Sequence, residues 1–256
     1  MYPTLDIPLS DGRKIYFASD IHFGEPNYKA TRERERKFLR WLDSIENDAQ
    51  ALFLVGDTFD FWFEYKTVIP KGYVRFLGKL AQLVDNGLPV YVFTGNHDLW
   101  INDYLEKEIG VTLFRSKVVV QSNNQKIFVA HGDGLGPGDT KFKLLKKVFT
   151  NPFCQWLFRW LHPDIGIKIA TLWSRRSRIG HDLEKFEGSD KEWLVAYAYR
   201  KLETAHYDYF IFGHRHIPIE FNLNDQSKYF NLGDWITSDS YAEFDGKQMA
   251  LKYFKQ

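Results

Sequence analysis

The chain has 256 residues, of which 44% are hydrophobic and 26% charged, and its formal net charge is +1. These values are ordinary for a globular protein, and the small net charge excludes a global field that would draw the chain to nucleic acid. The single cysteine, Cys154, excludes an internal disulfide and a cluster of thiolate metal ligands. The aromatic content of 17% is high, which suggests apolar surface with a use beyond filling a core.

The N-terminus lacks the basic and apolar regions of a signal peptide. No apolar run approaches the ~20 residues that a membrane-spanning helix needs. We therefore expect a cytoplasmic protein, and the aromatic residues leave room for contact with a membrane surface.

Apolar strands alternate with amphipathic helices through the first half of the chain. Residues 14–18 and 51–55 are predicted strands, separated by a charged helix with one apolar face that begins near Ala30. A second helix over 73–84 precedes a strand at 90–94, and a short helix is expected at 104–109. The sequence Ser122-Asn123-Asn124 predicts a hairpin between 111–121 and 126–130. This alternation predicts an α/β fold with helices on the faces of a sheet.

The alternation of predicted strands and helices stops at residue 134. Residues 134–187 have no strand pattern and combine helical spacing with aromatic and basic side chains. We predict that they form a helical cap inserted into a single domain of residues 1–256. The cap aromatics Phe149, Phe153, Trp156 and Trp160 either contact a lipid or only pack the cap onto the core. The aromatic loop 59–65 has the same two interpretations, packing beneath the sheet edge or a wall of the substrate cleft.

Five apolar strands each end in Asp, Asn or His. Because the carboxyl ends of strands in α/β proteins face the ligand crevice, we expect these side chains to meet there. Side chains two residues apart on an extended segment point the same way, so Asp20 and His22 are expected to reach one site together, as are His214 and His216. The candidate metal ligands are Asp20, His22, Asp57, Asn96, His131, His214 and His216.

The donor atoms of this set are oxygens and imidazole nitrogens, without sulfur. Such ligands suit Mn²⁺, Mg²⁺, Fe²⁺ or Zn²⁺. Seven ligands are too many for one ion, so we expect two ions that share Asp57. Two ions ~3.5–4 Å apart acidify a bridging water and neutralise phosphoryl oxygens, which predicts hydrolysis at phosphorus. His97 is a candidate for stabilising the transition state or protonating the leaving oxygen, and Asp98 for orienting its imidazole.

A single Asp-x-His pair is common outside metal sites, so the prediction depends on the conjunction of five strand-end motifs. Together they resemble the calcineurin-like metallophosphoesterase superfamily: Asp20-x-His22, Gly56-Asp57, Gly95-Asn96-His97-Asp98, His131 and Gly213-His214-x-His216. The resemblance implies a β-sandwich flanked by helices. It also implies that one ion takes Asp20, His22, Asp57 and His216, and that the other takes Asp57, Asn96, His131 and His214.

Further motifs resemble the UDP-2,3-diacylglucosamine hydrolase family. They are His131-Gly-Asp133 with Asp139, the basic aromatic stretch that follows, and Leu232-Gly-x-Trp235. That family hydrolyses a pyrophosphate in lipid A biosynthesis, usually with Mn²⁺, to give UMP and 2,3-diacylglucosamine 1-phosphate. The resemblance implies a lipid-linked UDP-sugar substrate, a cap that holds acyl chains, and a peripheral location at the cytoplasmic face of the inner membrane. It implies substrate contacts by Asn96, His97, Asp139, Ser177 and His214, and Arg175, Arg176 and Arg178 are further candidates because guanidinium groups match phosphate.

The chain departs from the pattern of that family at four positions. His97 replaces an arginine, Phe142 a tyrosine, and His181 and Glu184 a small polar residue and a lysine. The alternative is therefore a metallophosphoesterase acting on a different lipid-linked or soluble nucleotide or phosphodiester. A non-catalytic scaffold is disfavoured because no candidate ligand is missing. A nucleic-acid module is disfavoured because the basic residues are local to the cap, and the sequence names no protein partner.

Overall fold

Two six-stranded sheets pack face to face in the computed structural model, which describes residues 2–136, 140–178, 188 and 191–255, without the side chains of 140–142, 173 and 175–178. The first sheet has the order β1 (Thr4–Asp6), β6 (Val118–Ser122), β7 (Gln125–Val129), β8 (Tyr209–Phe212), β10 (Lys228–Leu232), β9 (Pro218–Asn222). The second has the order β12 (Met249–Tyr253), β11 (Ser240–Phe244), β2 (Lys14–Ala18), β3 (Ala49–Val55), β4 (Val90–Phe93), β5 (Thr112–Phe114). This confirms the α/β class and the sandwich that the resemblance implied.

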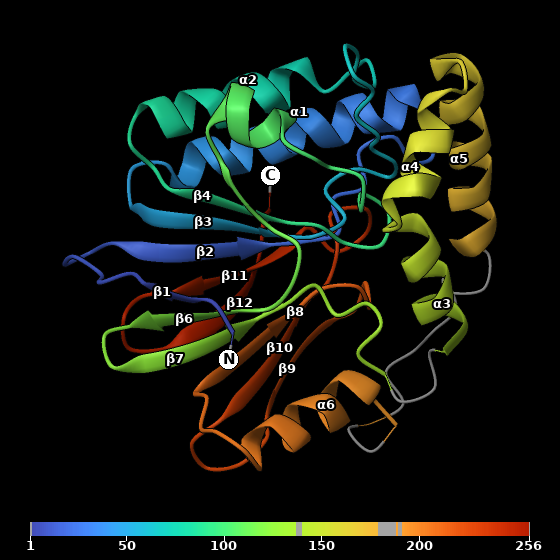
Figure 1. Cartoon of the computed structure of the whole chain (residues 1–256). Coiled ribbons are helices and arrows are strands. Elements are labelled where there is room, and N and C mark those ends of the chain that lie inside the picture. The colour runs from blue at the N-terminus through green and yellow to red at the C-terminus, as the bar shows by residue number, and fades with distance from the viewer. Residues whose placement is uncertain (1, 137–139, 179–187, 189–190, 256) are drawn as a thin grey trace.

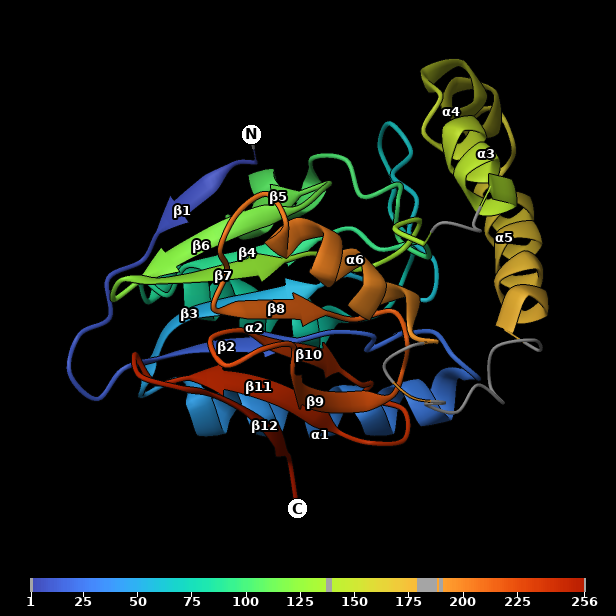
Figure 2. The same ribbon diagram turned by 90° about the horizontal axis from the view of Figure 1, so that it is seen from below.

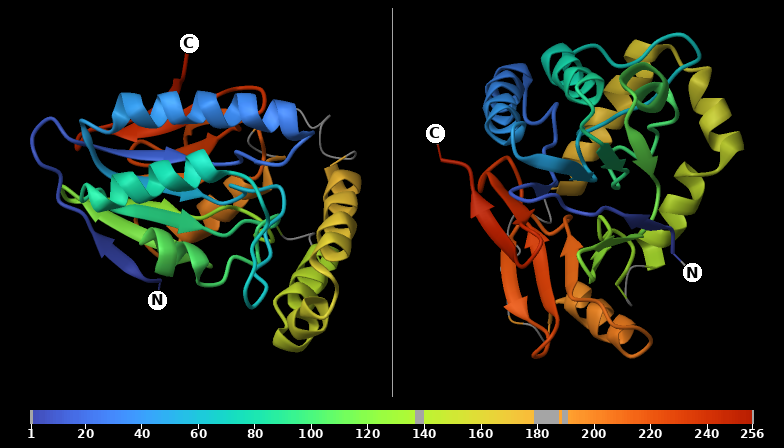
Figure 3. Two further views of the ribbon diagram at one scale, coloured as in Figure 1. Left: turned by 90° about the horizontal axis from the view of Figure 1, so that it is seen from above. Right: turned by 90° about the vertical axis from the view of Figure 1, so that its left-hand side faces the viewer.

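Helices cover the outer faces of both sheets. Helices α1 (Tyr28–Ile45) and α2 (Val74–Asp85) lie on the second sheet, and α6 (Trp193–Leu202) lies on the first (Figures 1 and 3). The short π-helix η1 (Leu105–Ile109) packs beside α2. The expected βαβ unit is present, because β2 and β3 pair in parallel across α1.

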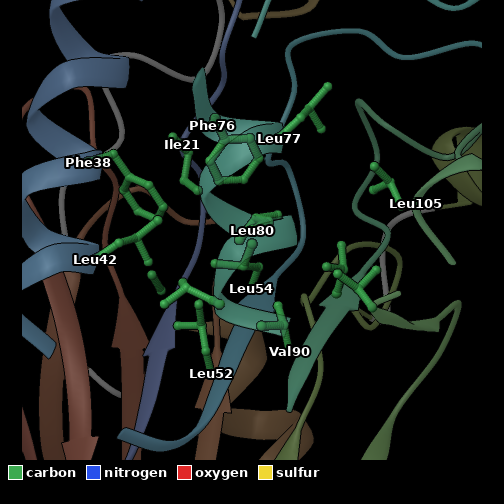
Figure 4. Packing of buried hydrophobic residues seen from close by; sticks show 14 of the residues in the cluster. Ile21, Phe38, Leu42, Leu52, Leu54, Phe76, Leu77, Leu80, Val90 and Leu105 are labelled. Carbon is green, nitrogen blue, oxygen red and sulfur yellow. The ribbon is translucent and has the colours of Figure 1, made fainter. Parts of the chain in front are cut away.

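The apolar runs are continuous because the central strands are buried on both faces. In β3, Leu52 and Leu54 point towards α1 and α2, where they meet Phe38 and Leu80 (Figure 4). Phe53, between them, points the other way into the core that the two sheets share. This alternation follows from the two-residue period of a strand.

One detail of the sheets differs from the expectation. The segment 111–121 forms two strands in different sheets, since β5 pairs with β4 while β6 pairs with β7. The predicted hairpin at Asn123-Asn124 is confirmed, and both residues have the positive φ that tight hairpin turns require. The first strand, β1, pairs with β6 in parallel, which brings the N-terminus to an edge of the first sheet.

Three helices follow β7 at one end of the sandwich: α3 (Thr140–Phe149), α4 (Pro152–Arg159) and α5 (Pro163–Arg178). Figures 1 and 2 show them beside the end towards which β2, β3 and β8 point. The loop 59–65 joins them to the core: Phe59, Trp62 and Phe63 are buried, and Phe63 also contacts Phe158 of α4 at 4.7 Å between ring centroids. These contacts support the packing interpretation for Phe59, Trp62 and Phe63. None of the helices in the described part of the chain has the length and apolar character to span a bilayer.

Candidate metal centre

The strand-end side chains converge at one end of the sandwich. Three sets of side chains place possible ligand atoms within 4.8 Å of one another: Asp20, His22 and His216; Asp57, His131 and His214; and His22, Asp60 and His97. Asn96 joins the second set, because its Oδ1 lies 3.2 Å from His131 Nε2. The structure thus brings together all seven candidate ligands, and it adds Asp60.

Asp57 lies between the first two sets. Its Oδ1 accepts a hydrogen bond from the backbone N–H of His97 at 2.8 Å, which fixes the carboxylate. Its Oδ2 lies 3.3 Å from His131 Nε2 on one side and 3.7 Å from His22 Nε2 on the other. One carboxylate oxygen therefore faces both sets of imidazoles.

Asp20 is held in the same manner. Its Oδ2 accepts the backbone N–H of His214 at 2.9 Å, and its Oδ1 lies 3.6 Å from His22 Nε2 and 3.4 Å from His216 Nε2. Oδ1 is buried and has no hydrogen-bond partner. A buried carboxylate oxygen left without a hydrogen bond is costly. A cation between Asp20 and the two imidazoles would satisfy it, so the donor set fits a metal ion.

The ligand-bearing loops have an unusual backbone. Asp20, His22, Asp57, His214 and His216 all have positive φ, between 49° and 70°. Non-glycine residues rarely adopt this conformation, and it clusters at functional sites. The expectation that the Asp20/His22 and His214/His216 pairs lie on extended segments is therefore wrong, since left-handed turns after the strands direct both members of each pair inward.

Glycines precede several ligands because the ligand side chains leave no room for a Cβ. A Cβ at Gly95 would overlap the carboxylate and backbone nitrogen of Asp57. A Cβ at Gly213 would lie 2.5 Å from Asp20 Oδ2. Cβ atoms essentially never come within 3.0 Å of such neighbours, so these two positions require glycine.

Outer hydrogen bonds orient the imidazoles. His131 Nδ1 lies 2.9 Å from the carbonyl oxygen of Val55, and His216 Nδ1 lies 3.3 Å from Asp234 Oδ2. An acceptor at Nδ1 holds a proton there, so Nε2 is the nitrogen that would face a cation, as in metal-binding histidines. The sequence did not single out Asp234 as a site residue, although it lies in the noted Leu232-Gly-x-Trp235 motif.

For the carboxylates and imidazoles of the site, burial and the attraction between opposite charges shift each pKa in opposite directions. Burial would raise the pKa of Asp57, but the neighbouring imidazoles, His131 first, hold it well below its usual range. Burial would lower the pKa of His131, but Asp57 raises it to about 10. Burial lowers the pKa of His214 to about 3, so its imidazole is neutral. The pKa of Asp20 is raised by burial despite the attraction of His216 and His131.

The imidazole of His97 has partners other than the expected one. Its Nδ1 lies 3.2 Å from the carbonyl oxygen of Asp60 and 2.9 Å from Ser174 Oγ. Asp98 instead accepts hydrogen bonds from the backbone N–H groups of Gly95, Thr58 and Phe59. The expected role of Asp98 in orienting His97 is therefore corrected: Asp98 fixes the loops, because three backbone donors point at its buried carboxylate.

Several expected substrate contacts cannot be placed. Asn96, His97 and His214 lie in the site. Asp139, His181 and Glu184 lie outside the described residues, and so do the side chains of Phe142, Arg175, Arg176, Ser177 and Arg178. Asp60 and Ser174 are site residues that the sequence analysis missed. Asp60 had a detectable signal, since it follows the Gly56-Asp57 motif, whereas Ser174 had none.

The family model of calcineurin-like phosphoesterases matches residues 13–218. A UDP-2,3-diacylglucosamine hydrolase of Porphyromonas gingivalis is 35% identical over 255 residues, 93% of this chain and 97% of that protein. Proteins of the same name from Edwardsiella ictaluri and Proteus mirabilis are 29% and 28% identical. Those matches cover 92% and 93% of this chain, and 90% and 98% of the relatives.

Proposed function

We propose that this chain, which belongs to the calcineurin-like phosphoesterase family, hydrolyses UDP-2,3-diacylglucosamine to UMP and 2,3-diacylglucosamine 1-phosphate in lipid A biosynthesis. Both resemblances drawn from the sequence motifs are confirmed by the comparisons. The observation that carries the reaction is the position of Asp57, whose Oδ2 faces His131 and His22 at once.

Two divalent cations are assigned to this site. The first would be held by Asp20, His22, Asp57 and His216, and the second by Asp57, Asn96, His131 and His214. The buried, unpartnered Asp20 Oδ1 and the Nε2 atoms of His131 and His216 support this assignment. Oxygen and imidazole donors favour Mn²⁺, with Mg²⁺, Fe²⁺ and Zn²⁺ as alternatives. Bound cations lower the pKa of water and neutralise phosphoryl oxygens.

The side chains around the cations position the substrate and move the proton. Nδ1 of His97 is occupied by Asp60 and Ser174, so Nε2 is the ring nitrogen left to act on the pyrophosphate. With one proton kept on Nδ1, the imidazolium carries its second proton on Nε2, from which it donates to the oxygen that leaves. We assign His97 the role of stabilising charge or donating a proton at the leaving oxygen. Asn96 and His214 are assigned as further substrate contacts, and Asp98 holds the loop that carries Asn96 and His97.

The three helices α3–α5 are assigned to the lipid part of the substrate, as the main part of a cap over residues 134–187. Phe149 packs on Trp100, with 5.3 Å between ring centroids, but three other aromatics are exposed: Phe153 by 64%, Trp160 by 75% and Trp156 by 50%. Of the two interpretations of these aromatics, contact with lipid is the one that exposure supports. Asp139, Arg175, Arg176, Ser177 and Arg178 are the cap residues assigned to the diphosphate and the sugar.

The same helices are assigned to the cytoplasmic face of the inner membrane. Ile165, Ile169 and Leu172 form an exposed apolar stripe on α5 at helical spacing. Lys147, Arg159 and Lys168 are exposed beside the apolar residues. Apolar side chains interspersed with cations suit an anionic lipid surface, where the substrate itself resides.

The test is hydrolysis of UDP-2,3-diacylglucosamine by the purified protein with Mn²⁺, followed by phosphorus NMR. A soluble diester, bis-(p-nitrophenyl) phosphate, is assayed in parallel. Rapid appearance of UMP and the sugar 1-phosphate, with slow turnover of the diester, is the expected result. Turnover of the diester alone would retain the metal centre and assign the chain to a different nucleotide or phosphodiester, and would make His97 in place of the family's arginine the first residue to examine.

A further inference from the structure

Ser174 connects helix α5 to the reacting end of the site. It is 6% exposed, whereas Ile165, Ile169 and Leu172 of the same helix are half exposed or more. Gly166, two turns earlier, faces the core as well, with no room for a Cβ beside the hydroxyl of Tyr65. Ser174 therefore belongs to the inner face of α5, the face that rests on the loop carrying Asp60.

The hydroxyl of Ser174 lies between an imidazole and a carboxylate. Its Oγ is 2.9 Å from His97 Nδ1 and 2.9 Å from Asp60 Oδ1. The ring of His97 is also held from another side, by edge contact with His22 at 4.9 Å between ring centroids. Among these partners of His97, Ser174 is the one that lies on helices α3–α5.

The direction of each hydrogen bond follows from the donors and acceptors. The backbone carbonyl of Asp60, 3.2 Å from His97 Nδ1, can only accept, so Nδ1 carries a proton. A carboxylate also only accepts, so the hydroxyl proton of Ser174 points to Asp60. Nδ1 of His97 then donates to the lone pair of Ser174 Oγ as well, so the ring is fixed with a proton on Nδ1, and Nε2 is the nitrogen from which a second proton can be transferred.

This order of contacts excludes a nucleophilic serine. In a Ser-His-Asp triad the imidazole takes the hydroxyl proton and the carboxylate orients the imidazole. Here Ser174 donates its hydroxyl hydrogen to the carboxylate of Asp60 and accepts from the imidazole, so His97 is not placed to remove the hydroxyl proton as the imidazole of a triad does. The geometry suits a serine that orients His97 and not one that attacks the substrate.

We propose that Ser174 is a positioning residue, which fixes the ring of His97 with a proton on Nδ1 and so makes the hydrolytic step depend on α5 lying against the core. The proposal rests on the proposed role of His97. The proposal adds that a helix assigned to binding the lipid also orients His97, a residue assigned to the hydrolytic step. A substrate without lipid therefore depends on Ser174 as well, since the contact is to His97.

The kinetic test compares Ser174→Ala, Ser174→Thr and Thr171→Ala with bis-(p-nitrophenyl) phosphate as substrate. Thr171 is a matched control, because its hydroxyl bonds to the carbonyl of Ile167 one turn earlier in the same helix. Ser174→Ala should lower kcat about tenfold with little change in KM, the size of effect typical of an outer residue that orients a reacting group. Ser174→Thr should restore most of the activity, and Thr171→Ala should match the wild type.

The second measurement does not depend on turnover. Long-range ¹H–¹⁵N spectra of protein labelled in its histidines and loaded with Mg²⁺ report the tautomer of His97. We expect a proton on Nδ1 in the wild type and in Thr171→Ala, and a shifted or mixed tautomer in Ser174→Ala. Unchanged His97 signals together with unchanged kcat in Ser174→Ala would overturn the proposal. An inactive wild type whose His97 signals still respond to Ser174→Ala would instead refute the proposed function and retain the positioning contact.

Discussion

The Oδ2 atom of Asp57 lies 3.3 Å from the Nε2 atom of His131. The same oxygen is 3.7 Å from Nε2 of His22, so it is shared by the ligand sets of both proposed cations. Ending strand β3 does not require a carboxylate that is buried between two imidazoles. The relationship makes Asp57 the residue on which both cations depend, and the first prediction concerns it.

Asp57→Asn should remove both cations and abolish hydrolysis. The amide keeps the size of the carboxylate but loses the charge that bridges the two sets of ligands. Metal content measured by mass spectrometry after dialysis should fall from two ions per chain towards none. Asp48→Asn is the control, since Asp48 lies at the other end of the strands and contacts Tyr16 and Lys14. A variant that retains two ions and activity would refute the bridging role.

His97→Gln should separate the reaction from metal binding. Turnover should fall by roughly 10²–10⁴-fold, the usual contribution of a proton-transferring side chain. The metal content should stay near two ions, because Asp57 is held by the backbone N–H of His97 and not by its ring. The control is His206→Gln, which changes a half-exposed imidazole beside Asp208. Loss of metal from His97→Gln would show that the ring is a ligand.

Gly95→Ala should damage the site although it adds only a methyl group. That methyl would overlap Asp57, so either the bridging carboxylate or the loop after β4 must move. We expect metal occupancy and diester hydrolysis to fall at least about tenfold, because small displacements of reacting groups are costly. Gly78→Ala in α2 is the matched control. No atom lies within 4 Å of the added methyl there, and thermal unfolding should show equal or higher stability, by up to ~1 kcal/mol.

Removing the cations should destabilise the fold. The site buries Asp20 and Asp57 among four imidazoles, and the unpartnered Asp20 Oδ1 is left without a counterpart when no cation is bound. A ligand that binds only the folded state adds ~2.7 kcal/mol when its concentration is 100 times its Kd. Treatment with a chelator should therefore lower Tm by several degrees, and Mn²⁺ should restore it. Asp57→Asn should show a Tm that is indifferent to the metal, and a chelator-insensitive Tm in the wild type would count against buried cations.

The candidate ligands could be predicted because each follows an apolar strand directly, and strand ends share one edge of a sheet. What the chain could not reveal is how distant segments meet. Ser174 and Asp60 are 114 residues apart, and no local pattern marks the serine. The parallel pairing of β1 with β6 and the division of 111–121 between two sheets also depend on tertiary contacts. Extended geometry was assumed at Asp20-x-His22, and the close approach of two loops imposed left-handed turns instead.

Membrane binding should depend on the exposed aromatic residues of α4 and its C-cap, Trp160. Trp160 and Phe153 are 75% and 64% exposed, so their replacement should not disturb the core. Burial of a large apolar side chain contributes about 1.5–3 kcal/mol, which predicts that Phe153→Ser with Trp160→Ser lowers the fraction bound to phosphatidylglycerol-containing vesicles at least about tenfold. Tm and hydrolysis of the soluble diester should not change. Tyr253→Ser, which removes a 51% exposed aromatic on β12, is the control and should bind as the wild type does. Sedimentation with vesicles at low and high salt measures the effect, and equal binding by the double variant and the wild type would remove α4 from the membrane contact.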